Sequence, residues 1–471
     1  MSPKGKNYED FSFIMEEIIR IQKKFQNEKK LENHKDAFCS LPHPSGVGEI
    51  LIGQAANMRF RSIANRALES NQKLKSKIQV AVLENSIKHF FQKDICAEHK
   101  ELTQSCADKI VAKAIKYVQK NKLVTRTHHF PCILPLDKNK HSFYVGPVFF
   151  TQTEKFLADK ECKLQSYEID VREQYITRDK EHFKRELTED EIKNIDELSK
   201  VFVSDLKDYY SDYPWIMALE IKEFEKGKSK EVAMLGAQTA LNIMRLFFPH
   251  NHAEKIQIAG RPKWEWKTSN LTETPDGKVE VSLQRRFRVS DETGWVETYC
   301  EGDGGEWLAM AGSLIPFLVS GEPVPLLYQR LINALWWYGE ALSIDVPYLK
   351  VTSLANALEA FLATEKENIA AQISERGKLL MSSEEENEDW GARIKQFYDI
   401  RSALVHGRIP AFDQDVSSQI GWGTRIVNRV LLDGLSWTRY LADKKAFNDI
   451  NKIHSYFEGD LERFCAGELN N

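Results

Sequence analysis

The chain has 471 residues, of which 42% are hydrophobic and 28% charged, the ordinary composition of a globular protein with two or three domains. Its formal net charge of -4 excludes a general electrostatic attraction to nucleic acid, so RNA binding requires a local basic patch. The sequence has no charged-then-apolar leader and no uninterrupted apolar run of bilayer length. Its seven cysteines, without a Cys-x-x-Cys pair, favour reduced thiols. We therefore expect a cytoplasmic protein with no membrane partner.

Residues 1–122 predict a mostly helical N-terminal region. Apolar residues recur at helical spacing among acids and lysines over residues 8–32, and helical patterns resume from 55 to 117. The proline- and glycine-containing segment 43–48 between them is typical of a loop.

Residues 123–300 predict a mixed α+β region. Short strands are expected at residues 124–130, 132–135, 143–150, 256–259, 264–266 and 279–289. The sequence Pro275-Asp-Gly277 is typical of a hairpin turn. The charged stretch 159–200 predicts one or two solvated helices, and residues 232–248 predict an amphipathic helix.

Residues 301–471 predict an all-helical bundle that follows a glycine-rich turn at 301–305. Helical spacing covers residues 306–319, 325–342, 349–365, 368–381, 389–406 and 416–443. Helices of this number and length form a bundle. The predicted fold class is therefore α+β overall, with a C-terminal all-α bundle preceded by a mixed α+β region and a helical N-terminal part.

The helix before Gly407 contains the most informative residues. On a helical period its apolar face comprises Ile394, Phe397, Tyr398, Leu404 and Val405, and its polar stripe comprises Lys395, Asp399, Ser402 and His406. Arg401 lies in the middle of the apolar face, where an unpaired charge is costly. Its guanidinium therefore requires a carboxylate, a phosphate or a partner subunit. Gly407 is the predicted C-cap.

The spacing of Arg401, Ser402 and His406 within Tyr398–Gly407 resembles the HEPN superfamily, and most closely its Apea-like branch. Three further segments fit that branch in chain order, at residues 331–338, 354–361 and 373–380. The resemblance covers roughly the last third of the chain, a domain-sized unit. It implies a HEPN-like bundle at 301–471 that acts as a metal-independent endoribonuclease without a cofactor.

The resemblance further implies the partners and the biological role. The substrate is expected to be RNA and not DNA, and two copies are expected to form a homodimer in which both motifs face one cleft. A role in bacterial defence is implied, as an antiviral protein or a growth-arrest toxin. The regions before residue 301 would then sense a trigger or restrain the nuclease.

In this interpretation Arg401 and His406 are the catalytic residues. RNA supplies its own nucleophile in the 2′-hydroxyl, histidine with a reference pKa of about 6.5 moves protons at neutral pH, and arginine binds phosphate through two parallel hydrogen bonds. Ser402 stands where the family more often has Asn, Asp or His. Ser402 and Asp399 are expected to support the site by orienting the His406 ring. Tyr398 is expected to be a core residue beside it.

Two alternatives stay open. In the structural one, Arg401 pairs with a buried carboxylate, for which Glu359 is the candidate, and His406 is a helix-end cation favoured by the helix dipole. Five residues on an ideal helix separate two side chains by about 140°, so Arg401 and His406 meet only if the helix end unwinds, Arg401 curls round or a second subunit contributes. The functional alternative is a non-catalytic HEPN module that binds RNA, a nucleotide or a protein partner.

Other chemistry-bearing residues have weaker patterns. Four arginines follow the motif and either contact an RNA backbone or form a solvated helix face, namely Arg408, Arg425, Arg429 and Arg439. Trp336-Trp-Tyr338 is expected to pack in the core. The spacing of Cys96, His99 and Cys106 fits no standard zinc pattern, and no metal is expected.

Overall fold

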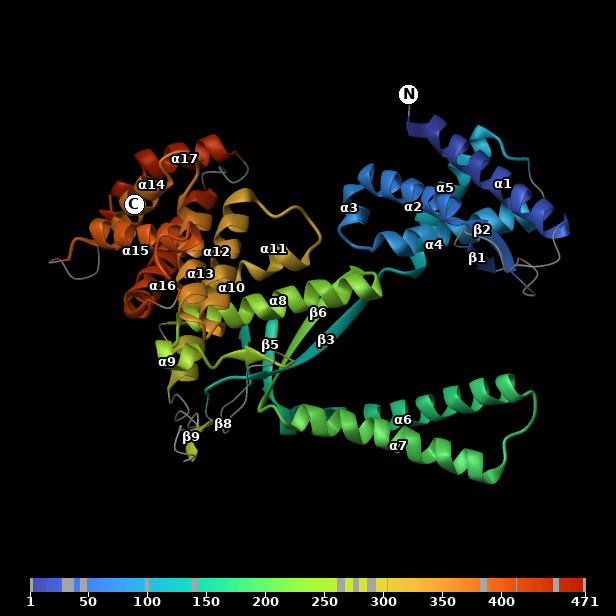
Figure 1. The fold of residues 1–471 in the computed structure, drawn as a ribbon, viewed down its shortest axis with the longest axis horizontal. Helices are drawn as coiled ribbons and strands as arrows, with labels where there is room; N and C mark the ends of the chain where they lie inside the picture. The colour runs from blue at the N-terminus through green and yellow to red at the C-terminus, as the bar shows by residue number, and fades with distance from the viewer. Residues whose placement is uncertain are drawn as a thin grey trace. The chain divides into compact units, whose positions relative to one another are not determined.

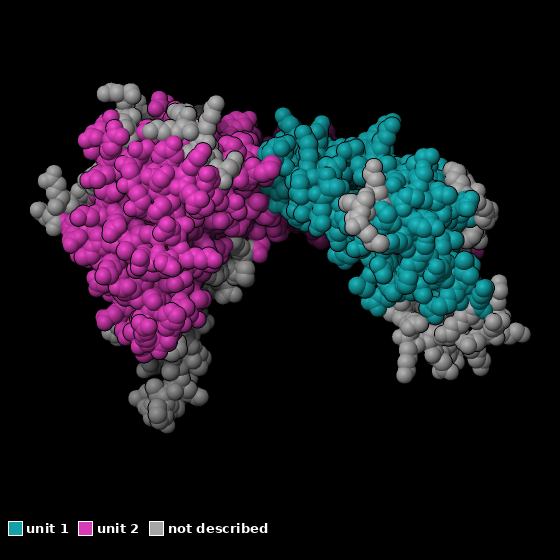
Figure 2. All heavy atoms as spheres, turned by 90° about the horizontal axis from the view of Figure 1, so that it is seen from above, with its two compact units in different colours: residues 1–128, 220–233, 319–322 teal, residues 129–219, 234–318, 323–471 magenta. Residues whose placement is uncertain are grey.

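The computed structural model describes residues 3–27, 38–42, 49–97, 101–136, 142–260, 267–273, 279–285, 294–302, 304–381, 388–411, 413–443 and 449–468. This part of the chain is mostly helical and contains antiparallel sheets, which confirms the α+β class (Figure 1). Contacts divide the chain into two compact units, coloured separately in Figure 2. Unit 1 comprises residues 1–128, 220–233 and 319–322, and unit 2 comprises residues 129–219, 234–318 and 323–471. The division at residues 122 and 300 stays a prediction.

Unit 1 is built from helices around one hydrophobic core. Its helices are α1 (Pro3–Asn27), α2 (Gln54–Glu69), α3 (Gln72–Lys75), α4 (Val80–Phe91) and α5 (Gln104–Asn121), with a π-helical turn η1 (Gln92–Ala97) after α4. Phe11 stacks on Phe91 with 5.3 Å between ring centroids, and Phe60 meets Phe91 edge-on at 5.4 Å. The helical periodicity of the sequence therefore identifies much of this core.

An antiparallel hairpin accompanies the helices of unit 1. Strand β1 (Phe38–Pro42) pairs with β2 (Glu49–Gly53), and the alternate residues Ile50 and Ile52 of β2 are buried. The prediction of a mostly helical region did not include this hairpin. Strands of five residues are too short to be distinguished from a buried helix segment by periodicity.

A five-stranded sheet has the strand order β4-β5-β6-β3-β7. Its strands are β3 (Val124–Ile133), β4 (Phe143–Val145), β5 (Val148–Gln152), β6 (Trp215–Phe224) and β7 (Gln257–Ile258). The strands expected at 124–130 and 256–259 are present, and the segment 143–150 divides into β4 and β5 at the turn of residues 146–147. Strand β6 was not predicted. The expected break at Pro131 is wrong. The Pro131 carbonyl accepts a hydrogen bond from the Ala259 N–H at 2.8 Å, because proline lacks the donor of the ladder but keeps the acceptor.

The chain forms helices between β5 and β6 and between β6 and β7. They are α6 (Thr153–Phe183), α7 (Glu189–Ser211), α8 (Lys226–Leu246) and the single turn α9 (His250–Ala253). Helices α6 and α7 lie side by side (Figure 1), and the Arg172–Asp196 ion pair at 2.5 Å joins them. They confirm the solvated helices predicted for the charged stretch. His250 and His252 lie in the helical turn α9.

A separate hairpin follows the sheet. Strand β8 (Lys267–Glu273) pairs antiparallel with β9 (Val279–Arg285), with Lys267 opposite Arg285. This pairing agrees with the strand predicted from residue 279. The predicted turn at Pro275–Gly277 and the strand at 264–266 lie outside the described residues.

The described residues of the C-terminal bundle form no strands, only helices. They are α10 (Gly305–Gly312), α11 (Ile315–Val319), α12 (Leu326–Ser343), α13 (Pro347–Leu362), α14 (Ile369–Leu380), α15 (Trp390–Val405), α16 (Gln414–Asp443), α17 (Ile450–Gly459) and α18 (Leu461–Cys465). The predicted helices are present within a few residues, except that 306–319 divides in two. Pro316 lacks the N–H that would continue the helix from Gly312. The short helices α17 and α18 were not predicted.

Two arginines close the C-terminal end of α13. Arg330 donates to the carbonyl of Phe361 at 3.0 Å, and Arg376 donates to Thr364 Oγ1 at 2.9 Å and to the carbonyl of Leu362. Arg376 also binds Glu458 Oε1 at 2.5 Å. Burial and the neighbouring Arg376 lower the pKa of Arg330 to about 10. These contacts satisfy carbonyls that a helix end leaves without partners, and they join the end of α13 to α12 and α14.

Candidate functional site

The motif helix α15 ends in a left-handed glycine. Gly407 has a φ of 68°, and its N–H donates to the Leu404 carbonyl at 3.1 Å. The N–H of Arg408 donates to the Ala403 carbonyl at 2.8 Å. These two hydrogen bonds form a Schellman motif with Gly407 one position after the C-cap, so the prediction of Gly407 as the C-cap itself is wrong by one residue. His406 is the C-cap.

The apolar face of α15 is shorter than predicted. Ile394, Phe397 and Tyr398 are buried, but Val405 is 55% exposed. The prediction that Val405 belongs to the buried apolar face is therefore wrong. Val405 is the last residue of α15, where helical phase alone does not decide burial.

Arg401 is held by residues of its own chain. Its Nη2 donates to Asn356 Oδ1 at 3.1 Å and lies 3.4 Å from Glu359 Oε2, both on α13. Its guanidinium carbon lies 5.6 Å from the centroid of the Tyr398 ring. The Arg401 side chain is 23% exposed, and its Nε is buried without a hydrogen-bond partner. Among the residues that the structure describes, Nη1 makes no hydrogen bond or ion pair.

Glu359 connects Arg401 to Tyr398. The Tyr398 hydroxyl donates to Glu359 Oε2 at 2.8 Å, so one carboxylate oxygen faces both the phenol and the guanidinium. Burial, followed by the hydrogen bond and the negative charge of Glu359, raises the pKa of Tyr398 to about 12. Tyr398 is therefore a neutral donor that fixes the carboxylate. The suggestion that Glu359 pairs with Arg401 agrees with this geometry.

His406 is exposed at the end of α15. Its neighbours on the polar stripe are the exposed Asp399 and the half-buried Ser402. Within the described ranges, the side chains of His406, Ser402 and Asp399 make no hydrogen bond or ion pair. Asp399 instead lines a shallow hollow of about 520 Å³ on the outer face of α15, together with Ala403 and Ile409. Within the described part of one chain, neither Ser402 nor Asp399 therefore forms the predicted contact that would orient the His406 ring.

The arginines after the motif have different surroundings. Arg408 is exposed, directly after Gly407. Arg425 lies over the rings of Trp390 and Trp422, at 5.5 and 5.9 Å from their centroids. Arg429 forms an ion pair with Asp433 at 2.8 Å, one helical turn away. Of these three predicted RNA contacts, Arg408 is the nearest in sequence to His406.

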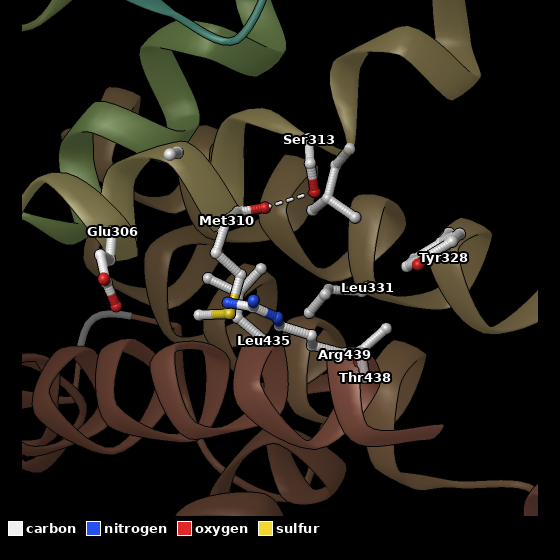
Figure 3. Close-up of a pocket in the computed structure, with 10 residues that line it drawn as sticks. Glu306, Met310, Ser313, Tyr328, Leu331, Leu435, Thr438 and Arg439 are labelled. Carbon is white, nitrogen blue, oxygen red and sulfur yellow. Dashed lines mark hydrogen bonds between the residues drawn. The ribbon is translucent and has the colours of Figure 1, made fainter. Parts of the chain in front are cut away.

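Arg439 belongs to a different feature of the bundle. It lines a cavity of about 440 Å³ between α10, α12 and α16, where Figure 3 shows its guanidinium beside Met310 and Leu435. Glu306 lies at another side of this cavity (Figure 3). Neither Arg401 nor His406 lines it. The predicted core segment Trp336-Trp-Tyr338 is only partly buried, since Tyr338 is 1% exposed and Trp337 is 42% exposed.

One residue of the Arg401 environment was missed in the sequence. Asn356 precedes Glu359 by three positions on α13, so the two side chains share a helix face. This spacing lies inside the segment 354–361 that carries the HEPN resemblance and is the signal that identifies Asn356 in retrospect. The pairing itself joins residues 45 positions apart and has no local pattern.

Neither a metal cluster nor a membrane span is found in the described part of the chain. No group of three or more His, Cys, Asp and Glu side chains there is placed to hold a metal ion. No described helix is both long enough and apolar enough to cross a bilayer. Comparisons with protein-family models, with curated proteins and with solved structures find no match for this chain.

Proposed function

We propose that the C-terminal bundle is a metal-independent endoribonuclease of the Apea-like HEPN type, in which Arg401 binds the scissile phosphate and His406 moves protons. The active form is a homodimer, and the role is in bacterial defence or growth arrest, as the resemblance implies. The observation that carries the proposal is that Arg401 is bound through only part of its guanidinium group. One edge of its guanidinium is held by Asn356 and Glu359, while Nη1 has no partner within the described residues.

This arrangement suits a phosphate clamp. Arginine binds phosphate through two parallel N–H donors, and a side chain whose rotamer is already held loses less entropy on binding. The Tyr398–Glu359 hydrogen bond of 2.8 Å keeps the carboxylate in position behind Arg401. Glu359 also offsets the positive charge, which lets Arg401 remain in a partly buried site before RNA arrives.

A second copy is needed to complete the site. His406 lies at the exposed end of α15, and the helix geometry directs it away from Arg401 of the same chain. In the proposed dimer, His406 of one copy meets Arg401 of the other over one phosphodiester. The arrangement is isologous, so two equivalent sites form around a two-fold axis.

The reaction needs no metal or external nucleophile. The 2′-oxygen of the RNA attacks phosphorus as the P–O5′ bond breaks, which yields a 2′,3′-cyclic phosphate and a 5′-hydroxyl. The imidazole of His406 accepts the proton of the 2′-hydroxyl, and the imidazolium that forms donates a proton to the leaving 5′-oxygen. Arg401 stabilises the charge that develops on the phosphate oxygens.

Cleavage of total RNA by the full-length protein in excess chelator tests the proposal. We expect cyclic-phosphate products from the wild type, and a loss of rate of about 10²–10⁴-fold in His406→Ala, as for a residue that transfers protons. Arg401→Lys keeps the charge but loses the two-pronged grip, so its rate should fall as well. Circular dichroism of each variant checks folding. Lys452→Ala, at an exposed position of α17 away from the motif, serves as the control and should cleave within a few-fold of the wild type.

Mixing two inactive variants tests the shared site. Arg401→Ala and His406→Ala should each be inactive, but their heterodimer contains one intact site, so mixing should restore about a quarter of the wild-type rate in a two-fold dimer. No restoration, with both variants folded and dimeric, would place both residues in one chain. Cleavage that depends on a divalent ion would exclude the mechanism altogether.

A non-catalytic binding module is the second candidate. The observation in its favour is that Asn356, Glu359 and Tyr398 already satisfy part of Arg401 within one chain. In that case the protein would bind RNA, a nucleotide or a protein partner without cleavage, and Arg401→Ala would lose stability instead of activity. Intact RNA after incubation with folded wild-type protein supports this candidate over the nuclease.

A further inference from the structure

A polar groove in unit 1 has no part in the proposed nuclease. Its volume is about 590 Å³, and it lies between α4, α5, the beginning of β3 and the N-terminal end of α8. Its lining includes the side chains of Tyr117, Lys122, Arg126 and Lys226. The whole groove belongs to unit 1.

Three cations in this groove lack a carboxylate partner. Arg126 donates only to backbone carbonyls, those of Phe224 at 3.0 Å and Val124 at 3.3 Å. The Nζ of Lys122 lies 5.7 Å from the centroid of the Tyr117 ring. Across the described ranges, Lys122, Arg126 and Lys226 form no ion pair. With three cations and one carboxylate among its lining residues, the groove carries a net positive charge and attracts an anion.

The one carboxylate that lines the groove is already bound. Glu225 accepts hydrogen bonds from the N–H groups of Gly227 at 2.8 Å and Lys228 at 3.0 Å, at the beginning of α8. Its negative charge therefore stabilises the helix N-terminus. Nearby, burial and then the charges of Arg126 and Lys230 lower the pKa of His128.

An aromatic ring lies beside these cations. Tyr117 is 36% exposed, and its ring is held by a stacked His89 at 6.5 Å and an edge-on Phe90 at 5.7 Å between centroids. The amide side chains of Asn85 and Asn121 line the same groove and are exposed. An aromatic face, amide groups and neighbouring cations are together the complement of a base that carries phosphate.

We propose that this groove binds a nucleoside phosphate. The base stacks on Tyr117, and the phosphate is held by Lys122, Arg126 and Lys226. The ligand is either a free nucleotide or one nucleotide of a single strand, since both present the same base and phosphate. This site is separate from Arg401 and His406, and the proposal does not depend on RNA cleavage.

Binding to the full-length protein tests the groove with two probes. One is ATP, followed by calorimetry, and the other is a fluorescein-labelled 2′-O-methyl octanucleotide, which lacks the hydroxyl needed for cleavage, followed by anisotropy. Binding of ATP alone identifies a free nucleotide as the ligand, and binding of the octanucleotide alone identifies a single strand; either supports the proposal.

Variants separate the cations from the ring. Lys122→Gln with Lys226→Gln should weaken binding at least about tenfold and reduce the salt dependence of octanucleotide binding by about 1.4 in log–log slope, the share of two phosphate contacts. The matched control is Lys116→Gln with Lys120→Gln, two exposed lysines of α5 outside the groove. Tyr117→Ala should weaken binding about five- to a hundredfold, whereas Tyr117→Phe keeps the ring and the affinity.

Three results would overturn the proposal. The first is a folded wild type that binds neither probe. The second is a charge variant whose affinity equals that of its lysine control. The third is wild-type affinity in Tyr117→Ala together with tight binding of inorganic pyrophosphate, which would reveal an anion site without base recognition.

Discussion

At the scale of single residues, the carboxylate of Glu359 determines the state of the motif arginine. Its Oε2 accepts the Tyr398 hydroxyl at 2.8 Å and lies 3.4 Å from Arg401 Nη2. The tyrosine must stay protonated for this hydrogen bond to exist. Ionisation would place a phenolate beside a carboxylate in a partly buried site, a repulsion that the charge of Arg401 reduces. This residue-level arrangement makes the bundle sensitive to alkaline pH.

Tyr398→Phe should reduce the alkaline loss of stability. Because the pKa of Tyr398 is raised to about 12 in the folded chain, its contribution is fully present below the pKa of the unfolded chain, about 10, and is lost as pH rises toward 12. The variant should be less stable than the wild type at pH 8, by about 0.5–1.5 kcal/mol for the lost hydrogen bond. The difference should shrink by pH 11. Urea unfolding at both pH values measures it.

Tyr144→Phe is the matched control for this titration. Tyr144 is 62% exposed and lies outside the bundle, so its substitution should change stability equally at both pH values. A Tyr398→Phe variant with the same deficit at pH 8 and pH 11 would contradict the proposed role of ionisation.

At the scale of elements, the end of α15 illustrates a local geometry that sequence specifies closely. The Schellman motif requires a left-handed residue after the C-cap, and Gly407 adopts a φ of 68°. The motif also directs the chain away from the helix directly after His406. The position of the histidine on the surface therefore depends on this glycine.

Gly407→Ala should destabilise the protein by about 1–2 kcal/mol, the cost of a left-handed conformation for a residue with a Cβ. No heavy atom lies within 4 Å of a Cβ at this position, so the cost arises from the backbone and not from a clash. If the turn also presents His406 correctly, RNA cleavage should fall more than stability requires. Thermal unfolding and the cleavage assay measure the two effects.

Gly421→Ala provides a control of opposite sign. Gly421 lies within α16, has no neighbour within 4 Å of a Cβ, and lacks a positive φ. Alanine should stabilise this helix by up to about 1 kcal/mol. Destabilisation by both substitutions to the same extent would exclude the proposed role of the left-handed turn.

At the scale of the whole molecule, the reactivity of the cysteine thiols measures how deeply each of them is buried in the two units. All seven cysteines are free, and they range from the exposed Cys162 to the buried Cys132. Burial raises the pKa of Cys132 well above its ordinary value, and burial with the acids Glu301 and Glu297 raises that of Cys300 to about 12. A thiol reacts as its thiolate, so these two positions are doubly protected.

Native protein treated with iodoacetamide at pH 8 should be alkylated first at Cys162 and last at Cys132 and Cys300. Cys96 and Cys465 should also be slow, since burial raises the pKa of each to about 11. Mass spectrometry of peptides gives the order. In urea all seven sites should react at similar rates, and Cys162→Ser should remove the fast phase of the native protein. Early alkylation of Cys132 would contradict the fold around β3.

The helices of the bundle and the glycine that ends α15 follow from the sequence, because helical periodicity and a left-handed cap depend on residues a few positions apart. The prediction that Val405 is buried is wrong, because the phase of a residue along one helix does not show whether a neighbouring helix covers it. Strand β6 and the β1–β2 hairpin were missed because strand pairing is decided by distant partners.

Local order alone therefore determined the class of the protein, the helices of its bundle and the residues of the motif. Only the tertiary structure decided what those residues contact. Asn356 and Arg401 meet across 45 positions, and the groove of unit 1 joins Arg126 to residues near Phe224, 98 positions away. Such contacts arise when helices and strands pack to bury apolar surface, and no pattern within one element contains them.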